Sequence, residues 1–303
     1  MPRVTILLTC YNHMRFLPAC VEGIRAQTFR DFEVIALDDG STDGTREWLA
    51  QQPDLITVFN ETNLGTYATL NVGLARATGE FVAVLNDDDL WAPTKLEAQL
   101  KLMDEHPKVG LAHTDGHFID GDGNRMEGTP LGFEFPRTET GDVLLDLVYQ
   151  NKIIASAALV RRECFERLGG FNPEYFGSGD WEMWLRVAEW YEIGFVAQPL
   201  TFYRVHGTNA SHKLDRIWRD DAKLRTWLAP RLESLGSRFP AALVRRAQAH
   251  NQAALGTVLT LNGDPKAGRA AYARSMRLMP GRIKSLIRWL ATFLPPSVFR
   301  KLL

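Results

Sequence analysis

The chain has few cysteines and no long apolar run. Its three cysteines, Cys10, Cys20 and Cys164, follow no metal-ligand spacing, and their odd number provides no disulfide framework. A reducing compartment is therefore the simpler expectation. The apolar run near the N-terminus is too short for a signal peptide, and no window approaches the roughly 18 apolar residues of a membrane span. These absences predict a cytoplasmic protein without a spanning helix.

Acidic residues are absent from the C-terminal end of the chain. Residues 265–303 contain nine Lys and Arg and no Asp or Glu, whereas the preceding residues hold 26 basic and 36 acidic side chains. The acidic body argues against nucleic acid as the main partner. The basic end favours peripheral contact with an anionic membrane, at the inner face of the cell membrane, through residues 282–303. Residues 282–294 predict a basic amphipathic helix, which either lies in a membrane interface or covers its own domain or a dimer partner.

The order of apolar segments predicts an α/β fold. Short runs rich in β-branched residues alternate with segments whose apolar residues recur at three- and four-residue spacing. The strands are expected at 4–9, 33–38, 55–59, 81–86 and 109–113, and the helices at 16–27, 43–51, 66–77 and 94–105. This alternation predicts a mostly parallel sheet with helices on both faces.

The second half of the chain changes from strands to helices. A turn at 120–124, strands at 156–160, 193–197 and 200–205, and helices at 161–168 and 180–191 are expected. Strand signals end near residue 212, and the remainder reads as helical. We therefore predict an α/β domain over residues 1–212 and an all-helical extension over residues 213–303.

Three polar stretches, "TCYN", "DDGST" and "NDDD", each follow an apolar strand. Ligands of such sheets bind beyond the carboxyl ends of the strands, so these stretches are expected along one edge. The carboxylates of Asp87, Asp88 and Asp89 repel one another unless water or a cation surrounds them. The triplet is therefore either a solvated turn before a helix or a cation site.

Five stretches in order resemble the inverting family 2 glycosyltransferases with a GT-A fold. They are "VTILLTCYN", "DFEVIALDDGSTDGT", "NLGTYATLNVGLARATGEFVAVLNDDD", "GD" before "WEMWLR", and "YRVHGTNAS", within residues 3–211. The resemblance implies transfer of a sugar from a nucleotide-diphospho-sugar, with UDP- or dTDP-sugars favoured, to a glycan or lipid-linked acceptor in cell-surface polysaccharide synthesis. The processive-synthase signature QxxRW is absent, which favours addition of one sugar per event.

The resemblance places a divalent metal at the acidic triplet. A departing diphosphate develops charge that a cation neutralises, and Mn²⁺ or Mg²⁺ binds through carboxylates, phosphate oxygens and water. "NDDD" occupies the place of the family's DxD motif, with Asn86 at its first position, so the number of carboxylate ligands stays open. The residues implied at the metal are Asp88, Asp89 and His206, and Asp87 is implied at the ribose or metal.

The resemblance also implies a nucleotide pocket at the ends of the first two strands. Tyr11 would stack on a pyrimidine, and Asp39 would accept a hydrogen bond from the base. The residues implied at the nucleotide are Thr9, Tyr11, Asn12, Asp39, Gly65, Asn71 and Asp87. Independently of any ligand, "DDGSTDGT" would form a turn and a helix N-cap through Ser41 or Thr42. Leu70 stands where the family often has Arg, which leaves the nucleotide open.

Inverting transfer requires a base that removes the proton of the acceptor hydroxyl. Asp180 matches the catalytic carboxylate of the family, although a helix N-cap uses the same residue type at the same place. Glu182 is the nearest competing carboxylate. Trp181 is a candidate for stacking on the acceptor sugar, and Arg204 is a candidate phosphate contact.

Two other functions remain open at this stage. A nucleotidyltransferase of related fold would need a Gly-rich, basic phosphate loop after the first strand, and "TCYNHMRF" contains none. A non-catalytic nucleotide-sugar-binding or scaffold protein of the same fold is disfavoured by Asp180 and by the intact acidic triplet. The glycosyltransferase interpretation accounts for the largest number of motifs.

Overall fold

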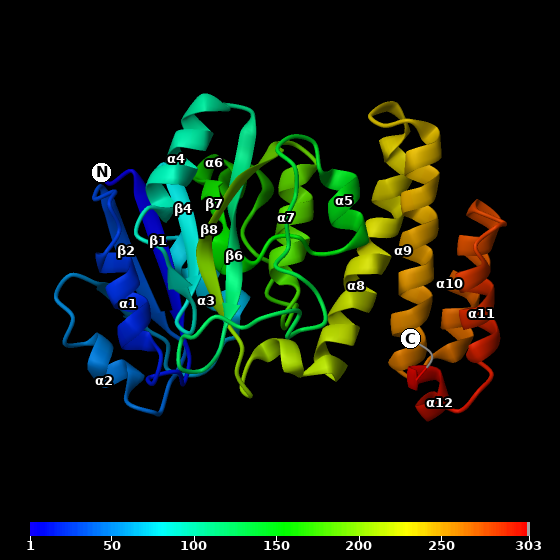
Figure 1. Ribbon diagram of the computed structural model, residues 1–303, viewed down its shortest axis with the longest axis horizontal. Helices are drawn as coiled ribbons and strands as arrows, with labels where there is room; N and C mark the ends of the chain where they lie inside the picture. The colour runs from blue at the N-terminus through cyan, green and yellow to red at the C-terminus, as the bar shows by residue number, and fades with distance from the viewer. Residues whose placement is uncertain (302–303) are drawn as a thin grey trace. The chain divides into compact units, whose positions relative to one another are not determined.

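The computed structural model describes residues 1–301, except for the side chains at positions 211, 296 and 297 (Figure 1). The last two residues of the predicted basic end lie outside the described residues. The chain forms two compact units. The sheet unit consists of residues 1–147, 151–175 and 179–209, and the helical unit consists of residues 148–150, 176–178 and the chain from Ala210 onward.

The described residues of the sheet unit form one eight-stranded mixed sheet. The strands are β1 (Val4–Cys10), β2 (Phe32–Asp38), β3 (Ile56–Phe59), β4 (Phe81–Asn86), β5 (Leu90–Trp91), β6 (Val109–Ile119), β7 (Leu159–Arg161) and β8 (Glu192–Arg204). They lie in the order β3-β2-β1-β4-β7-β6-β8-β5. β3, β2, β1 and β4 are parallel, as are β6 and β8. β7 joins the two parallel groups in the antiparallel direction.

Helices connect the strands of the sheet unit, and all of these helices except α5 lie at predicted positions. They are α1 (Leu17–Arg25), α2 (Thr45–Leu49), α3 (Thr66–Leu74), α4 (Lys95–Glu105), α5 (Leu144–Tyr149), α6 (Arg162–Leu168) and α7 (Gly179–Ala188). Pro18 stands in the first turn of α1, where its missing N–H costs no hydrogen bond. The predicted mostly parallel sheet is confirmed.

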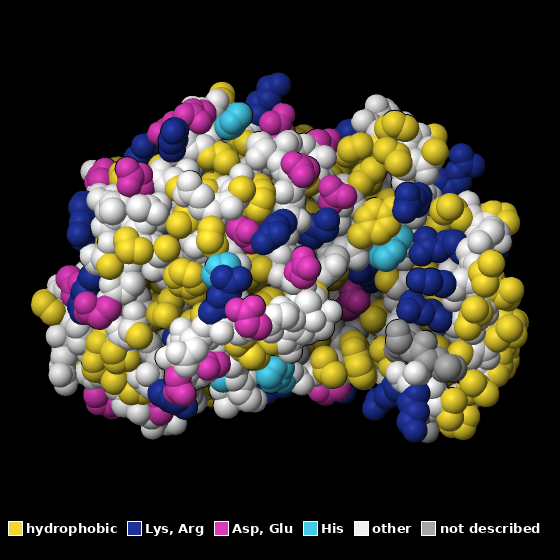
Figure 2. Space-filling model, in the orientation of Figure 1, with side chains coloured by type: hydrophobic (Ala, Val, Ile, Leu, Met, Phe, Trp, Pro, Cys, Tyr) yellow, Lys and Arg dark blue, Asp and Glu magenta, His cyan; other side chains and the backbone are white. Residues whose placement is uncertain are grey.

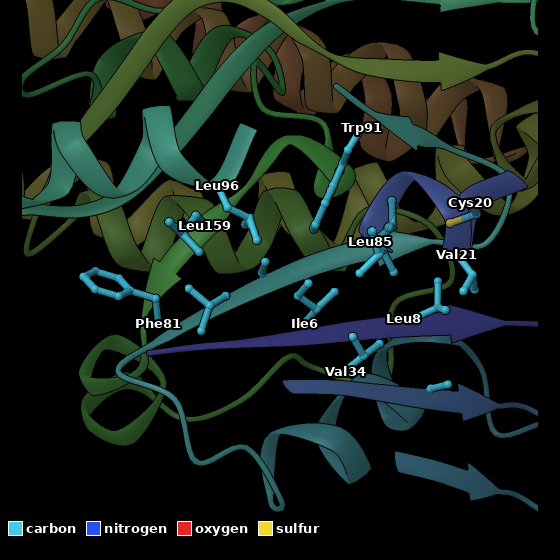
Figure 3. Close-up of a cluster of buried hydrophobic side chains, with 14 of the residues drawn as sticks. Ile6, Leu8, Cys20, Val21, Val34, Phe81, Leu85, Trp91, Leu96 and Leu159 are labelled. Atoms are coloured by element: carbon cyan, nitrogen blue, oxygen red, sulfur yellow. The ribbon is translucent and has the colours of Figure 1, made fainter. Parts of the chain in front are cut away.

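Side chains along β1 point alternately to the two faces of the sheet, and all of them are buried. Ile6 and Leu8 pack with residues of α1 and α4 in one hydrophobic core (Figure 3). Leu7 points to the other face, where α3 crosses so closely that a Cβ on Gly73 would lie 2.8 Å from Leu7 Cδ2. Strand side chains alternate between faces, so a continuous apolar run serves both layers. This arrangement confirms helices on both faces.

Four elements, β5, β6, β8 and α5, differ from the sequence-based expectation. β6 continues to Ile119 rather than ending near 113, and β8 is a single strand where two were expected. The pairing of β6 with β8 shifts register around Asp115, which accommodates polar and small residues that break the apolar pattern. β5 and α5 were not predicted, because two residues of strand and one short helical turn carry no periodic signal.

The described part of the helical unit contains helices α8 to α12. They are α8 (Leu214–Glu233), α9 (Ala241–Leu261), α10 (Pro265–Leu278), α11 (Ile283–Ala291) and α12 (Pro296–Lys301), and short 3₁₀ turns flank α8. Asp264 caps α10 by accepting the Ala267 N–H at 2.9 Å. α9 and α10 approach through Gly256 and Gly268, since a Cβ on Gly268 would lie 2.8 Å from Gly256 O. Among residues 1–301, no helix combines the length and apolarity required to cross a bilayer.

Candidate active site

The carboxyl ends of β1, β2 and β4 bring the three polar stretches to one edge of the sheet. Thr9 pairs with Asn86 in the parallel register, and Cys10 pairs with Asp38. The Thr9 hydroxyl donates to Asn86 Oδ1 at 3.1 Å. The Tyr11 N–H donates to Asp87 Oδ2 at 3.0 Å, while the Tyr11 side chain stays exposed. The expected convergence therefore occurs, with the Tyr11 ring free to meet a flat ligand.

The three aspartates of the triplet point to three different sets of partners. Asp87 lies 2.8 Å from His13 Nδ1, and Asp88 Oδ2 lies 3.0 Å from His206 Nε2. Asp89 accepts hydrogen bonds from the Ser156 hydroxyl and from the backbone N–H of Arg204. All three carboxylates are buried. The triplet is therefore not a solvated turn.

Burial and neighbouring charges shift the pKa values of Asp87, Asp89 and His13. Desolvation raises the pKa of Asp87, although the neighbouring His13 opposes the shift. Desolvation and the charge of Asp88 hold the pKa of Asp89 well above its usual range. Burial alone would lower the pKa of His13, but its hydrogen bond to Asp87 and the nearby carboxylates raise that pKa to about 8. The burial of these carboxylates therefore disfavours their charged forms, and a cationic partner at the turn would offset that cost.

His13, Asp88 and His206 form a group with metal-binding chemistry. One ligand atom from each residue lies within 4.8 Å of the others. Thr208 Oγ1 lies 2.7 Å from His206 Nδ1 and would accept a hydrogen bond from Nδ1–H if Nε2 were a metal ligand. Asp88 and His206, both predicted at the metal, are thus brought together. Asp89 lies outside this group because its oxygens already accept two hydrogen bonds.

His13 was missed by the sequence analysis. It lies in the loop after β1, two residues beyond Tyr11, and a single histidine in a loop carries no spacing signal. Its ring meets the His206 ring edge to face, with 5.1 Å between the centroids. The residue becomes a candidate ligand only when the tertiary structure brings the two loops together.

Arg204 positions the acidic turn. Its Nε donates to the backbone carbonyl of Asp88 at 2.7 Å, and its Nη1 donates to the carbonyls of Asp120 and Gly121 at 2.9 and 3.2 Å. The buried guanidinium also lies over the Phe16 ring, 4.8 Å from the centroid. These contacts link the β4 turn to the turn after β6. They do not favour the predicted phosphate contact.

Asp39 organises the loop that precedes α3. Its Oδ1 accepts hydrogen bonds from Asn60 Nδ2, Leu64 N and Thr69 Oγ1 at 2.7–3.0 Å, and its Oδ2 accepts from Gly65 N at 2.9 Å. Gly65 adopts a φ of +88°, which favours glycine. Because Oδ2 accepts one hydrogen bond where Oδ1 accepts three, Oδ2 retains acceptor capacity for the predicted base contact.

The adjacent Asp38 differs from Asp39. Among the described residues, its buried Oδ2 has no hydrogen-bond partner, and Arg46 Nε lies 4.0 Å away.

The predicted N-cap through Ser41 or Thr42 is wrong, because α2 begins at Thr45 after Gly44 without a side-chain cap. The Ser41 hydroxyl instead accepts the Asn12 N–H, and the Thr42 N–H donates to Asn12 Oδ1. Asn12 therefore joins the loops after β1 and β2.

Replacing Asp39 should destabilise the fold. In Asp39→Asn an NH₂ group replaces one acceptor oxygen opposite backbone donors, and we expect the free energy of unfolding to fall by about 2–4 kcal/mol. Urea denaturation measures the change, with Asp38→Asn as the matched control. The Asp38→Asn substitution should lower the free energy of unfolding by less than about 1 kcal/mol, because Asp38 Oδ2 makes no hydrogen bond within residues 1–301 that the substitution would break. Equal losses in both variants would contradict this account of Asp39.

Asn71 holds a distant backbone segment. Its Nδ2 donates to Phe171 O at 2.7 Å, and its Oδ1 accepts the Phe171 N–H at 2.8 Å. A Cβ on the neighbouring Gly170 would lie only 2.3 Å from Asn71 Oδ1. The predicted nucleotide contact of Asn71 is not favoured, because both polar atoms of its side chain already bond the loop between α6 and α7.

Asp180 is held at the start of α7 in a partly exposed position. Its Oδ1 accepts the Trp181 N–H at 2.7 Å and lies 3.4 Å from the Tyr67 hydroxyl, while Asn151 Nδ2 lies 3.3 Å from Oδ2. Desolvation raises the pKa of Asp180 to about 6, although these hydrogen bonds oppose the shift. A Cβ on Gly179 would lie 2.7 Å from the Tyr67 ring, which accounts for glycine there. The carboxylate is thus oriented and has a pKa suited to a base near neutral pH.

The neighbours of Asp180 have structural roles. The predicted sugar-stacking role of Trp181 is not favoured, because the ring is buried and its Nε1 donates to Leu147 O at 2.8 Å. Trp184 lies fully in the core. The buried Glu182 pairs with Arg186, with Oε1 and Nε 2.8 Å apart, and so does not compete as a base. Asp180 is the carboxylate of this turn that is suited to proton transfer.

The sequence profile of Glycosyl transferase family 2 matches residues 5–169, which is more than half of the chain. The chain belongs to this family. A curated relative, an uncharacterized glycosyltransferase of Nostoc sp., is 29% identical over 220 residues, covering 68% of this chain and 66% of the relative. The chain thus spans just under two thirds of that relative, and about a third of several other glycosyltransferases that it matches.

Solved structures share the fold of this family 2 glycosyltransferase. The crystal structure of S. aureus TarS 1–349 has a TM-score of 0.68 at 16% identity, covering 99% of this chain and 90% of that one. A mannosyltransferase of Pyrobaculum calidifontis, solved with GDP-Man and Mn²⁺, has a TM-score of 0.61 at 21% identity, with coverages of 99% and 84%. The expected GT-A fold and the family are confirmed.

Proposed function

We propose that this glycosyltransferase moves one sugar, with inversion, from a nucleotide-diphospho-sugar to a saccharide or lipid-linked acceptor in cell-surface polysaccharide synthesis. The observation that carries the proposal is Asp180, a partly exposed carboxylate with a pKa of about 6 in a family 2 fold. Among the structural relatives, TarS has been solved with UDP-GlcNAc and the mannosyltransferase with GDP-Man. UDP- or dTDP-sugars remain the favoured donors. Peripheral membrane contact would bring the enzyme to a lipid-linked acceptor.

Asp180 supplies the proton acceptor in this mechanism. In a single displacement, the acceptor oxygen attacks the anomeric carbon as the bond to the diphosphate breaks, and Asp180 takes the hydroxyl proton. The Tyr67 hydroxyl and the Asn151 amide fix the direction of the carboxylate. A pKa of about 6 leaves most Asp180 side chains ionised at neutral pH. The acceptor therefore meets a base that is already deprotonated and oriented.

The donor set at the acidic turn fits a divalent cation. His13, Asp88 and His206 would hold the ion, with Thr208 orienting His206. Imidazole ligands suit Mn²⁺ and other transition metals better than Mg²⁺, which prefers oxygen ligands and water. When bound, the ion stabilises negative charge on the departing diphosphate. We therefore propose Mn²⁺ in preference to Mg²⁺.

Thermal-shift and product assays test the donor and the metal together. MnCl₂ with UDP-GlcNAc, UDP-glucose or GDP-mannose should stabilise the protein more than MgCl₂ with the same nucleotide. A ligand at 100 times its Kd adds about 2.7 kcal/mol to the free energy of unfolding. One sugar nucleotide should also release nucleoside diphosphate slowly by hydrolysis. Release of sugar 1-phosphate would instead indicate nucleotidyl transfer, and stabilisation without turnover would indicate a binding protein.

The variant His13→Gln tests the metal assignment. It should lose most of the Mn²⁺-dependent shift, because it removes one of three candidate ligands. His106→Gln is the matched control, since His106 is exposed at the end of α4 and outside the cluster. Equal shifts with Mn²⁺ in His13→Gln and the wild type would exclude His13 from the metal site.

A further inference from the structure

The helix α11 and the turn after it expose a continuous apolar stripe. Six large apolar side chains recur at three- and four-residue spacing and are each between 45% and 69% exposed. They are Ile283, Leu286, Ile287, Leu290, Phe293 and Leu294. An amphipathic helix of a globular protein normally turns this stripe toward the core. Here, within residues 1–301, the stripe faces outward.

The opposite side of α11 fixes this orientation. Ser285 is buried, and its Oγ lies 3.2 Å from the Oγ of Ser275 on α10, which in turn donates to the Ala249 carbonyl of α9 at 2.7 Å. Ala291 and Thr292 are buried as well. The helix thus packs on α9 and α10 through small and polar residues. The alternative in which the apolar face covers its own domain is not what the structure shows.

Basic side chains lie beside the apolar stripe (Figure 2). The chain from residue 265 carries nine Lys and Arg and no acidic residue, and Arg274, Arg277 and Lys284 are exposed. Figure 2 shows hydrophobic side chains gathered along the edge where Figure 1 places α11, beside a column of Lys and Arg side chains. Trp289 lies partly buried against Phe293, with 5.3 Å between the ring centroids.

The charge pattern distinguishes between two possible binding partners of this surface, an anionic membrane and a second copy of the chain. An apolar stripe with a basic border matches the interface of an anionic membrane, where acyl chains lie beneath phosphate groups. A second copy of the chain would instead bring two basic surfaces together with no acidic partner in either segment. The membrane is the occupant that satisfies both the apolar and the charged groups.

We propose that α11 and the turn to Leu294 insert into the interface of an anionic membrane, with the apolar stripe in the acyl region and the basic border at the lipid phosphates. This inference deepens the proposed membrane contact and rests on the proposed function only for the use of a lipid-linked acceptor. The attachment is peripheral and reversible, because one short helix and a basic border provide limited affinity.

Vesicle flotation tests the inference without any donor. The wild type should float with phosphatidylcholine vesicles that contain phosphatidylglycerol, float much less with phosphatidylcholine alone, and dissociate as salt is raised. The variant Ile287→Ser/Leu290→Ser should partition about tenfold or more weakly, because it removes two apolar anchors. Leu243→Ser is the matched control, since Leu243 on α9 is comparably exposed and lies outside the stripe.

Two further measurements separate the outcomes. Circular dichroism and the midpoint of thermal unfolding should match the wild type in Ile287→Ser/Leu290→Ser, because the replaced side chains are exposed. Sugar-nucleotide hydrolysis without vesicles should also be unchanged, so a failure of the proposed chemistry and a failure of membrane binding are distinguishable. Equal flotation of variant and wild type would overturn the inference. A wild-type dimer that this variant converts to a monomer would also overturn it, in favour of a second copy as occupant.

Discussion

The variant Asp180→Asn should lower kcat for sugar transfer by about 10²–10⁴-fold, which is the usual contribution of a general base. The amide keeps the shape of the side chain and its contact distances to Tyr67 and Asn151, but it cannot accept the proton of the acceptor hydroxyl. Donor binding should survive, so the thermal shift with nucleotide and Mn²⁺ should match that of the wild type. Steady-state kinetics with the identified donor and acceptor measures the change.

The pH dependence of kcat/KM provides an independent check on Asp180. A pKa of about 6 means that activity should fall about tenfold for each pH unit below 6, and should level off above it, because only the ionised form accepts a proton. The Asn variant should lack this acidic limb. Asp146→Asn, at an exposed carboxylate in the first turn of α5, is the matched control and should keep the wild-type profile. A wild-type rate unchanged between pH 5 and 8 would exclude Asp180 as the base.

The variant Asp88→Asn should have the second large effect. Loss of the carboxylate between His13 and His206 should weaken metal binding and lower kcat/KM by roughly 10²–10³-fold, in line with several kcal/mol of charge stabilisation at the diphosphate. Mn²⁺-dependent stabilisation should fall with it. Rates in EDTA and after restoration of Mn²⁺, measured beside the thermal shift, test both expectations.

The control for Asp88 is Asp122→Asn. Asp122 is an exposed carboxylate in the turn after β6 and pairs with the exposed Arg15 at the surface. It should keep both the rate and the metal response. Full activity of Asp88→Asn in EDTA would show that the acidic turn has no role in metal-assisted departure of the diphosphate.

The sequence predicts the layout of the sheet unit well because that layout follows local patterns. Apolar runs of strand length alternate with helical segments, and the resulting parallel strands bring their carboxyl ends to one edge. Asp180 was also predicted in the first turn of a helix. These features depend on periodicity and chain order, which a single sequence contains.

The contacts that a motif does not reveal join residues far apart in the chain. Asp88 and His206 are 118 positions apart, and Asn71 meets Phe171 across 100 positions. A motif indicates which residue types gather at a site, but it does not reveal whether backbone groups already use their hydrogen-bonding atoms. Asn71 and Arg204 were for that reason assigned to ligands, although they hold backbone carbonyls.

The close packing of α3 against the start of α7 limits how this enzyme can be recombined with its relatives. A chimaera with α3 from one parent and α7 from another would separate Tyr67 from Gly179, where a Cβ would lie 2.7 Å from the ring. It would also separate Asn71 from the peptide of Phe171. A chimaera that keeps both contacts therefore takes the two helices and the loop before α7 from the same parent.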